Sequence, residues 1–204
     1  MRRRLLAAVL AAGCVAVPAA HADGDPASDY LLSQDTFLPF DANISKEQAA
    51  QLNAVVADAK KKGFTIKVAV IAKPFDLGAV PSLYRKPKTY ARFLGQELFF
   101  LYKGRLLIVM PNGYGAGRGG KPLSSAQRPL DTMPAPGEGR AALTAAAAQA
   151  VQRLAAQNGV RVVIPPVASG NSQTNDRIII AGIAGGLVLL LLGGFVARRI
   201  LARR

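Results

Sequence analysis

The feature that most constrains this chain is an uncharged stretch of twenty residues near its C-terminal end, residues 178–197. An apolar helix of about twenty residues spans the hydrocarbon core of a bilayer, because a helix satisfies its backbone polar groups internally. Four arginines follow the stretch within residues 198–204, and basic residues favour the cytoplasmic side of a membrane. We therefore expect a transmembrane helix at 178–197, a cytoplasmic tail at 198–204, and the remainder of the chain outside the cytoplasm.

The first 22 residues have the layout of a secretory signal peptide. Three arginines precede an apolar run, and the sequence Ala20-His21-Ala22 has the small-residue pattern of a cleavage site. We expect a signal peptide at residues 1–22 and a single-pass type I protein in the cell membrane. An alternative stays open, because residues 11–14 resemble a lipid-attachment motif that would modify Cys14.

Cleavage after Ala22 would remove Cys14 and His21, which are the only cysteine and the only histidine. The mature chain would then form no disulfide, no Cys–His or Ser-His-Asp catalytic site and no typical zinc site. A bound metal would need oxygen ligands, which points to Ca²⁺ or Mg²⁺. The candidate metal ligands in the predicted domain are Asp35, Asp41 and Asp76.

Hydrophobic periodicity predicts one extracytoplasmic domain at residues 35–167, with a flexible lead-in at 23–34 and a Ser- and Asn-rich linker at 168–177. Helices are predicted at 45–62, 88–103 and 140–158, strands at 64–72, 105–110 and 160–164, and a candidate leading strand at 36–40. Ser45 and Gln48 form the pattern of a capping box at the start of the first helix. Helices that alternate with strands favour an α/β fold, a small three-layer sandwich with a mostly parallel sheet.

The predicted domain is strongly basic. Between residues 35 and 168 there are 18 Lys and Arg against 8 Asp and Glu, a net charge of +10. Such a charge suits an anionic neighbour such as lipid headgroups, an envelope polymer or an acidic protein, although a solvated basic face is the plain alternative. We expect no nucleic-acid partner, because the domain is predicted to lie outside the cell. The candidate anion- or partner-binding residues are Arg85, Lys86, Lys88, Arg92, Arg118 and Lys121.

The glycine-rich segment 112–120 is predicted to be a flexible loop, and residues 121–137 show no periodicity. Gly115, Gly120 and Lys121 have the spacing of a phosphate-binding loop. Pro122 stands where such a loop needs Ser or Thr, and no helix is predicted to begin there. Nucleotide binding is therefore not expected, but Arg118 and Lys121 remain candidates for gripping an anion.

Several segments resemble TPM domains, the family named for thylakoid, photosystem II repair and MOLO proteins. The resemblance lies in residues 62–70 (KGFTIKVAV), 90–99, 103–110 (KGRLLIVM) and 112–115 (NGYG), within a region of about 35–164. It implies an α/β domain behind a signal peptide and beside a membrane helix. Family members include acid phosphatases and assembly or accessory factors, and their metal sites use acidic residues near the sheet edge. This chain departs from them in its basic charge and in lacking a close acidic pair.

Two functional hypotheses follow. The first is a non-enzymatic binding or accessory module of a bacterial cell envelope, whose basic face holds an anionic or protein partner. The second is a divalent-metal-dependent phosphatase of the TPM type. The missing histidine and the missing acidic pair favour the first. Gly182 and Gly186 form a G-x-x-x-G pattern in the predicted anchor, which suits a homodimer through that helix.

Overall fold

A computed structural model describes residues 24–39 and 44–167 of the chain. The predicted signal peptide, linker, transmembrane helix and cytoplasmic tail lie outside these residues, as does Asp41. Within the part that is described, no helix has both the length and the apolar character needed to cross a membrane.

The core of the fold is a five-stranded sheet in the order β1-β2-β3-β4-β5. Its strands are β1 (Thr36–Phe37), β2 (Ile66–Val70), β3 (Arg105–Met110), β4 (Gly113–Arg118) and β5 (Lys121–Pro122). The first three strands are parallel, whereas β4 and β5 each pair antiparallel with the strand before them. The α/β class is thus confirmed, but the sheet is mixed rather than mostly parallel.

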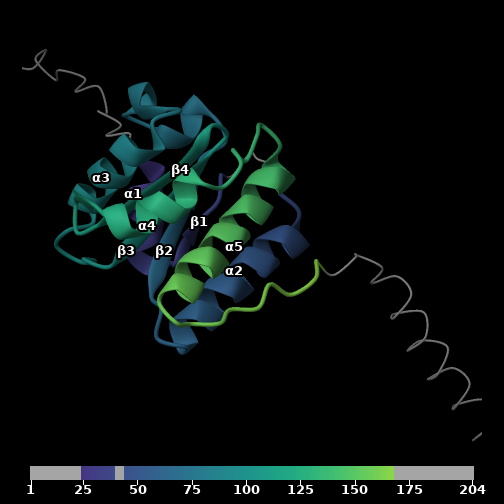
Figure 1. Cartoon of the computed structure of the whole chain (residues 1–204). Helices are drawn as coiled ribbons and strands as arrows, with labels where there is room; N and C mark the ends of the chain where they lie inside the picture. Colours follow the sequence, from purple (N-terminus) through teal and green to yellow (C-terminus); the bar gives the residue numbers. More distant parts are fainter. Residues whose placement is uncertain (1–23, 40–43, 168–204) are drawn as a thin grey trace, which may run out of the picture.

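Helices cover both faces of the sheet (Figure 1). One face packs against α2 (Lys46–Lys61), α4 (Ser124–Asp131) and α5 (Arg140–Gln157). The other packs against α1 (Pro26–Ser33) and α3 (Pro87–Glu97), with the 3₁₀ turns η1 (Pro74–Leu77) and η2 (Pro81–Leu83) leading into α3. The β1–α2–β2 and β2–α3–β3 crossovers step the same way across the sheet but pass over opposite faces. They therefore have opposite hands, and one departs from the right-handed rule.

The helix with the clearest sequence signal forms as predicted. The Ser45 hydroxyl accepts a hydrogen bond from the Gln48 amide at 3.2 Å, and the Gln48 side chain accepts one from the Ser45 amide at 3.3 Å. This capping box satisfies amide groups that the first turn of α2 leaves without a partner. The buried face of α2 carries the predicted apolar residues Leu52, Val55, Val56 and Ala59. Helix α5 likewise confirms the helix predicted at 140–158.

The predicted flexible lead-in at 23–34 is wrong where the structure describes it, because it contains α1. Asp25 caps this helix by accepting a hydrogen bond from the Ala27 amide at 3.2 Å. Ala27 and Leu31 have no exposed surface and join the core beneath α3. The helix is short and its apolar face is narrow, so packing against the sheet layer stabilises it more than its own helix propensity does.

The strand predicted at 160–164 does not form. This segment passes along the outside of α2 and α5 in Figure 1 and pairs with no strand. Side chains of those two helices bind it instead: Gln152 donates to the Val162 carbonyl at 2.8 Å, and Lys62 donates to the Arg161 carbonyl at 2.9 Å. The apolar run therefore reflects contact with helices, and its outward residue Val163 stays 63% exposed.

The glycine-rich segment forms strand β4 rather than a flexible loop. Gly115 and Gly117 face α3, and a side chain at Gly115 would overlap the carbonyl oxygen of Pro87. A side chain at Gly117 would lie 3.0 Å from the carbonyl oxygen of Ala91. The glycines therefore let the backbone of α3 lie directly on the strand, which fixes the position of both elements.

We expect Gly115→Ala to destabilise the fold by at least about 2 kcal/mol, because the added methyl group has no space against the α3 backbone. Gly139→Ala is the matched control. Its new methyl group would meet only ordinary contacts. Gly139 is the N-cap of α5, and replacing glycine by alanine there should cost less than about 1 kcal/mol. Urea unfolding followed by circular dichroism measures both free energies, and equal values for the two variants would contradict the packing described.

Candidate functional site

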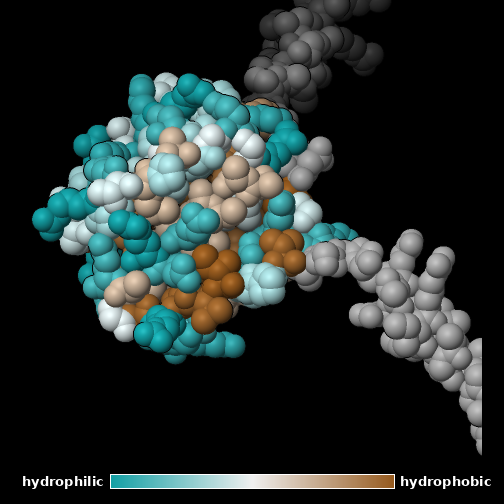
Figure 2. Space-filling model, turned by 45° about the vertical axis from the view of Figure 1, so that its right-hand side comes forward, coloured by the Kyte–Doolittle hydropathy of each residue, from teal (hydrophilic) through white to brown (hydrophobic). Residues whose placement is uncertain are grey.

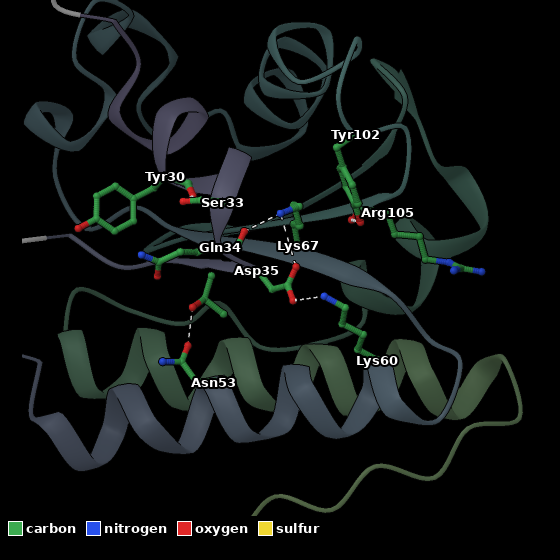
Figure 3. Close-up of polar contacts among 10 residues, drawn as sticks. Tyr30, Ser33, Gln34, Asp35, Asn53, Lys60, Lys67, Tyr102 and Arg105 are labelled. Carbon is green, nitrogen blue, oxygen red and sulfur yellow. Dashed lines mark hydrogen bonds and ion pairs between the residues drawn. The ribbon is translucent and has the colours of Figure 1, made fainter.

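The carboxylates predicted as metal ligands do not come together in the described residues. Asp35 forms an ion pair with Lys60 at 2.8 Å and another with Lys67 at 3.5 Å (Figure 3). Burial opposes the charged form of Asp35, but the Lys60 hydrogen bond and the two lysine charges outweigh it and lower the pKa of this carboxyl. Asp35 therefore serves to neutralise Lys67, whose side chain is almost fully buried.

Asp76 is 5% exposed and accepts hydrogen bonds from the backbone amides of Ala72 and Lys73, at 2.7 and 2.8 Å. These bonds fix the turn that leads from β2 into η1. Within the described ranges 24–39 and 44–167, no group of three or more Asp, Glu, His or Cys side chains is placed to hold a metal ion. The structure thus gives Asp35 and Asp76 structural contacts, and Asp41 lies outside the residues described.

The basic cluster at the start of α3 is partly neutralised. It consists of Arg85, Lys86, Lys88 and Arg92. Arg85 forms an ion pair with Glu138, and Lys88 forms one with Asp131 at 2.9 Å. These pairs join the start of α3 to α4 and to the segment before α5. Lys86 and Arg92 are exposed, and no carboxylate of the described residues pairs with either. The cluster acts mainly as a connection between elements, with two cations left facing solvent.

Arg118 and Lys121 lie opposite each other in the β4–β5 hairpin. The turn between them consists of Gly119 and Gly120, which both adopt positive φ angles, 53° and 74°. Glycine accommodates these angles without steric cost. The two cations are therefore held on paired strands rather than on an adaptable loop, and Arg118 belongs to a larger site.

An arginine-lined cleft of about 690 Å³ opens at the end of the β3–β4 ladder. Arg105 of β3 and Arg118 of β4 are direct cross-strand partners, and both line it. Arg128 of α4 and Arg153 of α5 complete the set from the helix layer. Of the described residues that line this cleft, none is acidic. Four cations from four elements thus line one cavity, and we name this cavity the arginine cleft.

Neutral groups position two of these arginines. The Arg105 guanidinium lies 4.7 Å from the centre of the Phe64 ring and donates to the Asn158 side chain at 3.4 Å. Arg153 donates to the Thr132 hydroxyl at 2.9 Å. These contacts orient the guanidinium groups without neutralising them. In the part of the chain described, none of the four arginines of the cleft forms an ion pair.

This arrangement is electrostatically unfavourable when the cleft is empty of counter-charge. Like charges directly opposite each other on an antiparallel pair destabilise a sheet, and guanidinium groups cannot lose their proton in proteins. The same groups present planar forks of N–H donors that match carboxylate and phosphate oxygens. The geometry therefore suits the binding of an anion that carries several oxygen atoms.

Only Arg118 of these four was among the sequence candidates. The other three were not candidates because of the segments in which they lie. Arg105 belongs to a predicted core strand, Arg128 belongs to a segment predicted to be irregular, and Arg153 lies on the polar side of a predicted helix. Their proximity follows from the antiparallel pairing of β4 with β3 and from the placement of α4. A reading of residues 113–118 as a strand would have found the Arg105–Arg118 pair.

A second buried group lies on the opposite face of the sheet. The Tyr90 hydroxyl contacts both carboxylate oxygens of Asp25, at 2.7 and 2.8 Å. The pKa of Asp25 is raised to about 6, mainly by desolvation and in part by the charges of Glu97 and Asp29, which together outweigh the opposing Tyr90 and Ala27 hydrogen bonds. The pair joins the start of α1 to α3 and has no opening to the arginine cleft.

Comparisons with family models, with curated proteins and with solved structures gave no match to this chain. The resemblance to TPM domains therefore stays a prediction.

The raised pKa of Asp25 predicts a pH-dependent stability. The folded state binds this proton more tightly than the unfolded state, whose carboxyl has the ordinary pKa of 3.8. Stability should therefore fall as the pH rises from about 4 to about 6. Asp25→Asn keeps an acceptor for Tyr90 and removes the buried charge, so it should raise the free energy of unfolding at pH 7.5 by up to about 3 kcal/mol.

Urea unfolding at pH 4.5 and 7.5 measures this difference. Glu47→Gln is the control, because Glu47 belongs to α2 on the other face of the sheet and does not contribute to the shift of Asp25, so this variant should keep the pH dependence. An Asp25→Asn variant that is less stable than the parent at pH 7.5 would contradict a buried, unfavourable carboxylate.

Proposed function

We propose that this protein is a membrane-anchored binding module that holds an anionic partner in the arginine cleft. The observation that carries the proposal is the direct opposition of Arg105 and Arg118 across β3 and β4, with Arg128 and Arg153 facing the same space. A site that gathers four cations without a carboxylate gains most from a ligand that supplies the missing negative charge.

The ligand chemistry follows from the donors. Four guanidinium groups offer forked N–H pairs from several directions, which favours a phosphate- or polycarboxylate-type group over a single carboxylate. A cleft of about 690 Å³ is within the usual size range of small-ligand sites. Ser125 also lines it and adds a hydroxyl group for the oxygens of such a ligand.

A simple solvated basic face explains the cleft less well. Cations on a solvated face lower their repulsion by spreading apart in water, whereas the sheet register fixes the backbones of Arg105 and Arg118 opposite each other. Two cations outside the cleft, Arg85 and Lys88, have carboxylate partners instead. The contrast supports a cleft reserved for an external anion.

The sequence motivates the location in this proposal. A signal peptide at 1–22 and a transmembrane helix at 178–197 would place the cleft outside the cytoplasm, near the bilayer. The anion would then be a phosphate-bearing envelope polymer or headgroup, or an acidic segment of an envelope protein. We do not propose a metal-dependent phosphatase, because the contacts of Asp35 and Asp76 lend it no support.

Inorganic pyrophosphate is a suitable probe of the cleft. We expect it to raise the melting temperature of the protein in a saturable way, because ligands that bind only the folded state stabilise it by mass action, about 2.7 kcal/mol at 100 times the Kd. The double variant Arg118→Gln/Arg128→Gln should lose this stabilisation. The control Lys61→Gln/Lys86→Gln removes the same charge from exposed positions outside the cleft and should retain it.

The anion-free stability gives a second, independent readout. Arg118→Gln removes one of two opposed like charges, so it should raise the free energy of unfolding without ligand by about 0.5 kcal/mol. The same variant should bind pyrophosphate more weakly. A variant that loses stability in the absence of anion, or a control that loses binding equally, would contradict the proposal.

A further inference from the structure

Three consecutive apolar side chains project from the turn that follows α3. Phe99, Phe100 and Leu101 are 42%, 91% and 77% exposed. We name them the apolar tip. They do not line the arginine cleft. Single exposed apolar residues are ordinary on protein surfaces, but two aromatic rings and a leucine side by side at one turn mark a contact surface.

The turn holds the apolar tip in a fixed shape. The amides of Leu101 and Tyr102 both donate to the Leu98 carbonyl, at 3.0 and 2.7 Å. The Tyr102 hydroxyl donates to the Arg105 carbonyl at 2.8 Å, which ties the far side of the turn to β3 (Figure 3). The rings of Phe99 and Phe100 meet edge to face at 6.0 Å. The exposure is therefore a property of an ordered turn.

Basic residues flank the apolar tip. The Lys103 ammonium lies 4.6 Å from the centre of the Phe99 ring. The β4–β5 turn lies beside the same ring, since a methyl group at Gly119 would come within 3.9 Å of it. Lys121 follows this turn and is exposed. Long lysine side chains can keep their charge at headgroup level while their stems lie along apolar groups.

We propose that the apolar tip inserts into the interfacial region of an anionic bilayer. Phe and Leu next to lysines are typical of interfacial membrane segments, whose apolar side chains lie at the boundary of headgroups and acyl chains while the cations meet anionic lipids. A stable protein interface needs about 800 Å² from each partner, and three residues on a narrow turn offer too little flat surface for one.

A bilayer is also the partner within reach in this proposal. The described domain ends at Val167, and ten residues separate it from the uncharged stretch at 178–197. Ten extended residues cover at most about 35 Å. A domain tethered at that distance meets the membrane surface at high effective concentration, so a weak insertion is enough to set its orientation.

The chain contains no tryptophan, so Phe100→Trp introduces a single fluorescent probe at the apolar tip. The full chain carrying this variant would be reconstituted in vesicles of phosphatidylcholine with phosphatidylglycerol, with and without brominated acyl chains. We expect a blue-shifted emission that the brominated lipids quench. Val163→Trp is the matched control, since Val163 is 63% exposed in a different segment, and its emission should stay water-like and unquenched.

The charge dependence is tested in the same assay. Lys103→Gln and Lys121→Gln should each reduce the inserted fraction relative to the free fraction by about fivefold, whereas Lys61→Gln should not. An emission that is water-like in anionic vesicles would overturn the proposal. A blue shift that brominated lipids do not quench would also overturn it, because the probe would then be buried against protein, as in a second copy of this chain.

Discussion

The register of β3 against β4 is the constraint on which the rest of the structure depends. Six residue pairs from Arg105↔Arg118 to Met110↔Gly113 set which side chains face each helix layer. Gly115 and Gly117 point to α3 and admit its backbone, while Tyr114 and Ala116 point to the opposite core. A shift of one residue would exchange the two faces of β4. It would place side chains against α3 and separate the arginine pair.

The two proposed surfaces lie at the same end of this ladder. The arginine cleft lies where β3 begins and β4 ends, and the apolar tip belongs to the turn that enters β3. The face drawn in Figure 2 is largely hydrophilic, with hydrophobic groups gathered in its lower part. Lys67 and Asp35 stabilise the adjoining edge by neutralising each other beside Tyr102 (Figure 3). A rigid strand pair can therefore present an anion site and a membrane contact together.

The sequence predicted the parts of the fold whose signals are local. The capping box at Ser45, the apolar face of α2 and the run at 105–110 each report their own conformation, and the structure confirms them. The errors arose where distant contacts decide. Glycines at 115 and 117 indicate a flexible loop when the sequence alone is considered, but they form a strand because α3 packs on them. Residues 160–164 have the apolar pattern of a strand, but side chains of neighbouring helices bind the segment instead. The arginine cleft was missed for the same reason, since Arg105, Arg128 and Arg153 meet only in three dimensions.

Anion binding in the arginine cleft is tested most directly by a pyrophosphate titration, followed by NMR through the side-chain Nε–Hε resonances of the arginines. We predict that the resonances of Arg105, Arg118, Arg128 and Arg153 shift together and give one Kd, while those of Arg85 and Arg92 stay in place. Shifts spread evenly over all arginines, or largest outside the cleft, would contradict it and would identify the charge of the domain as a solvated basic surface.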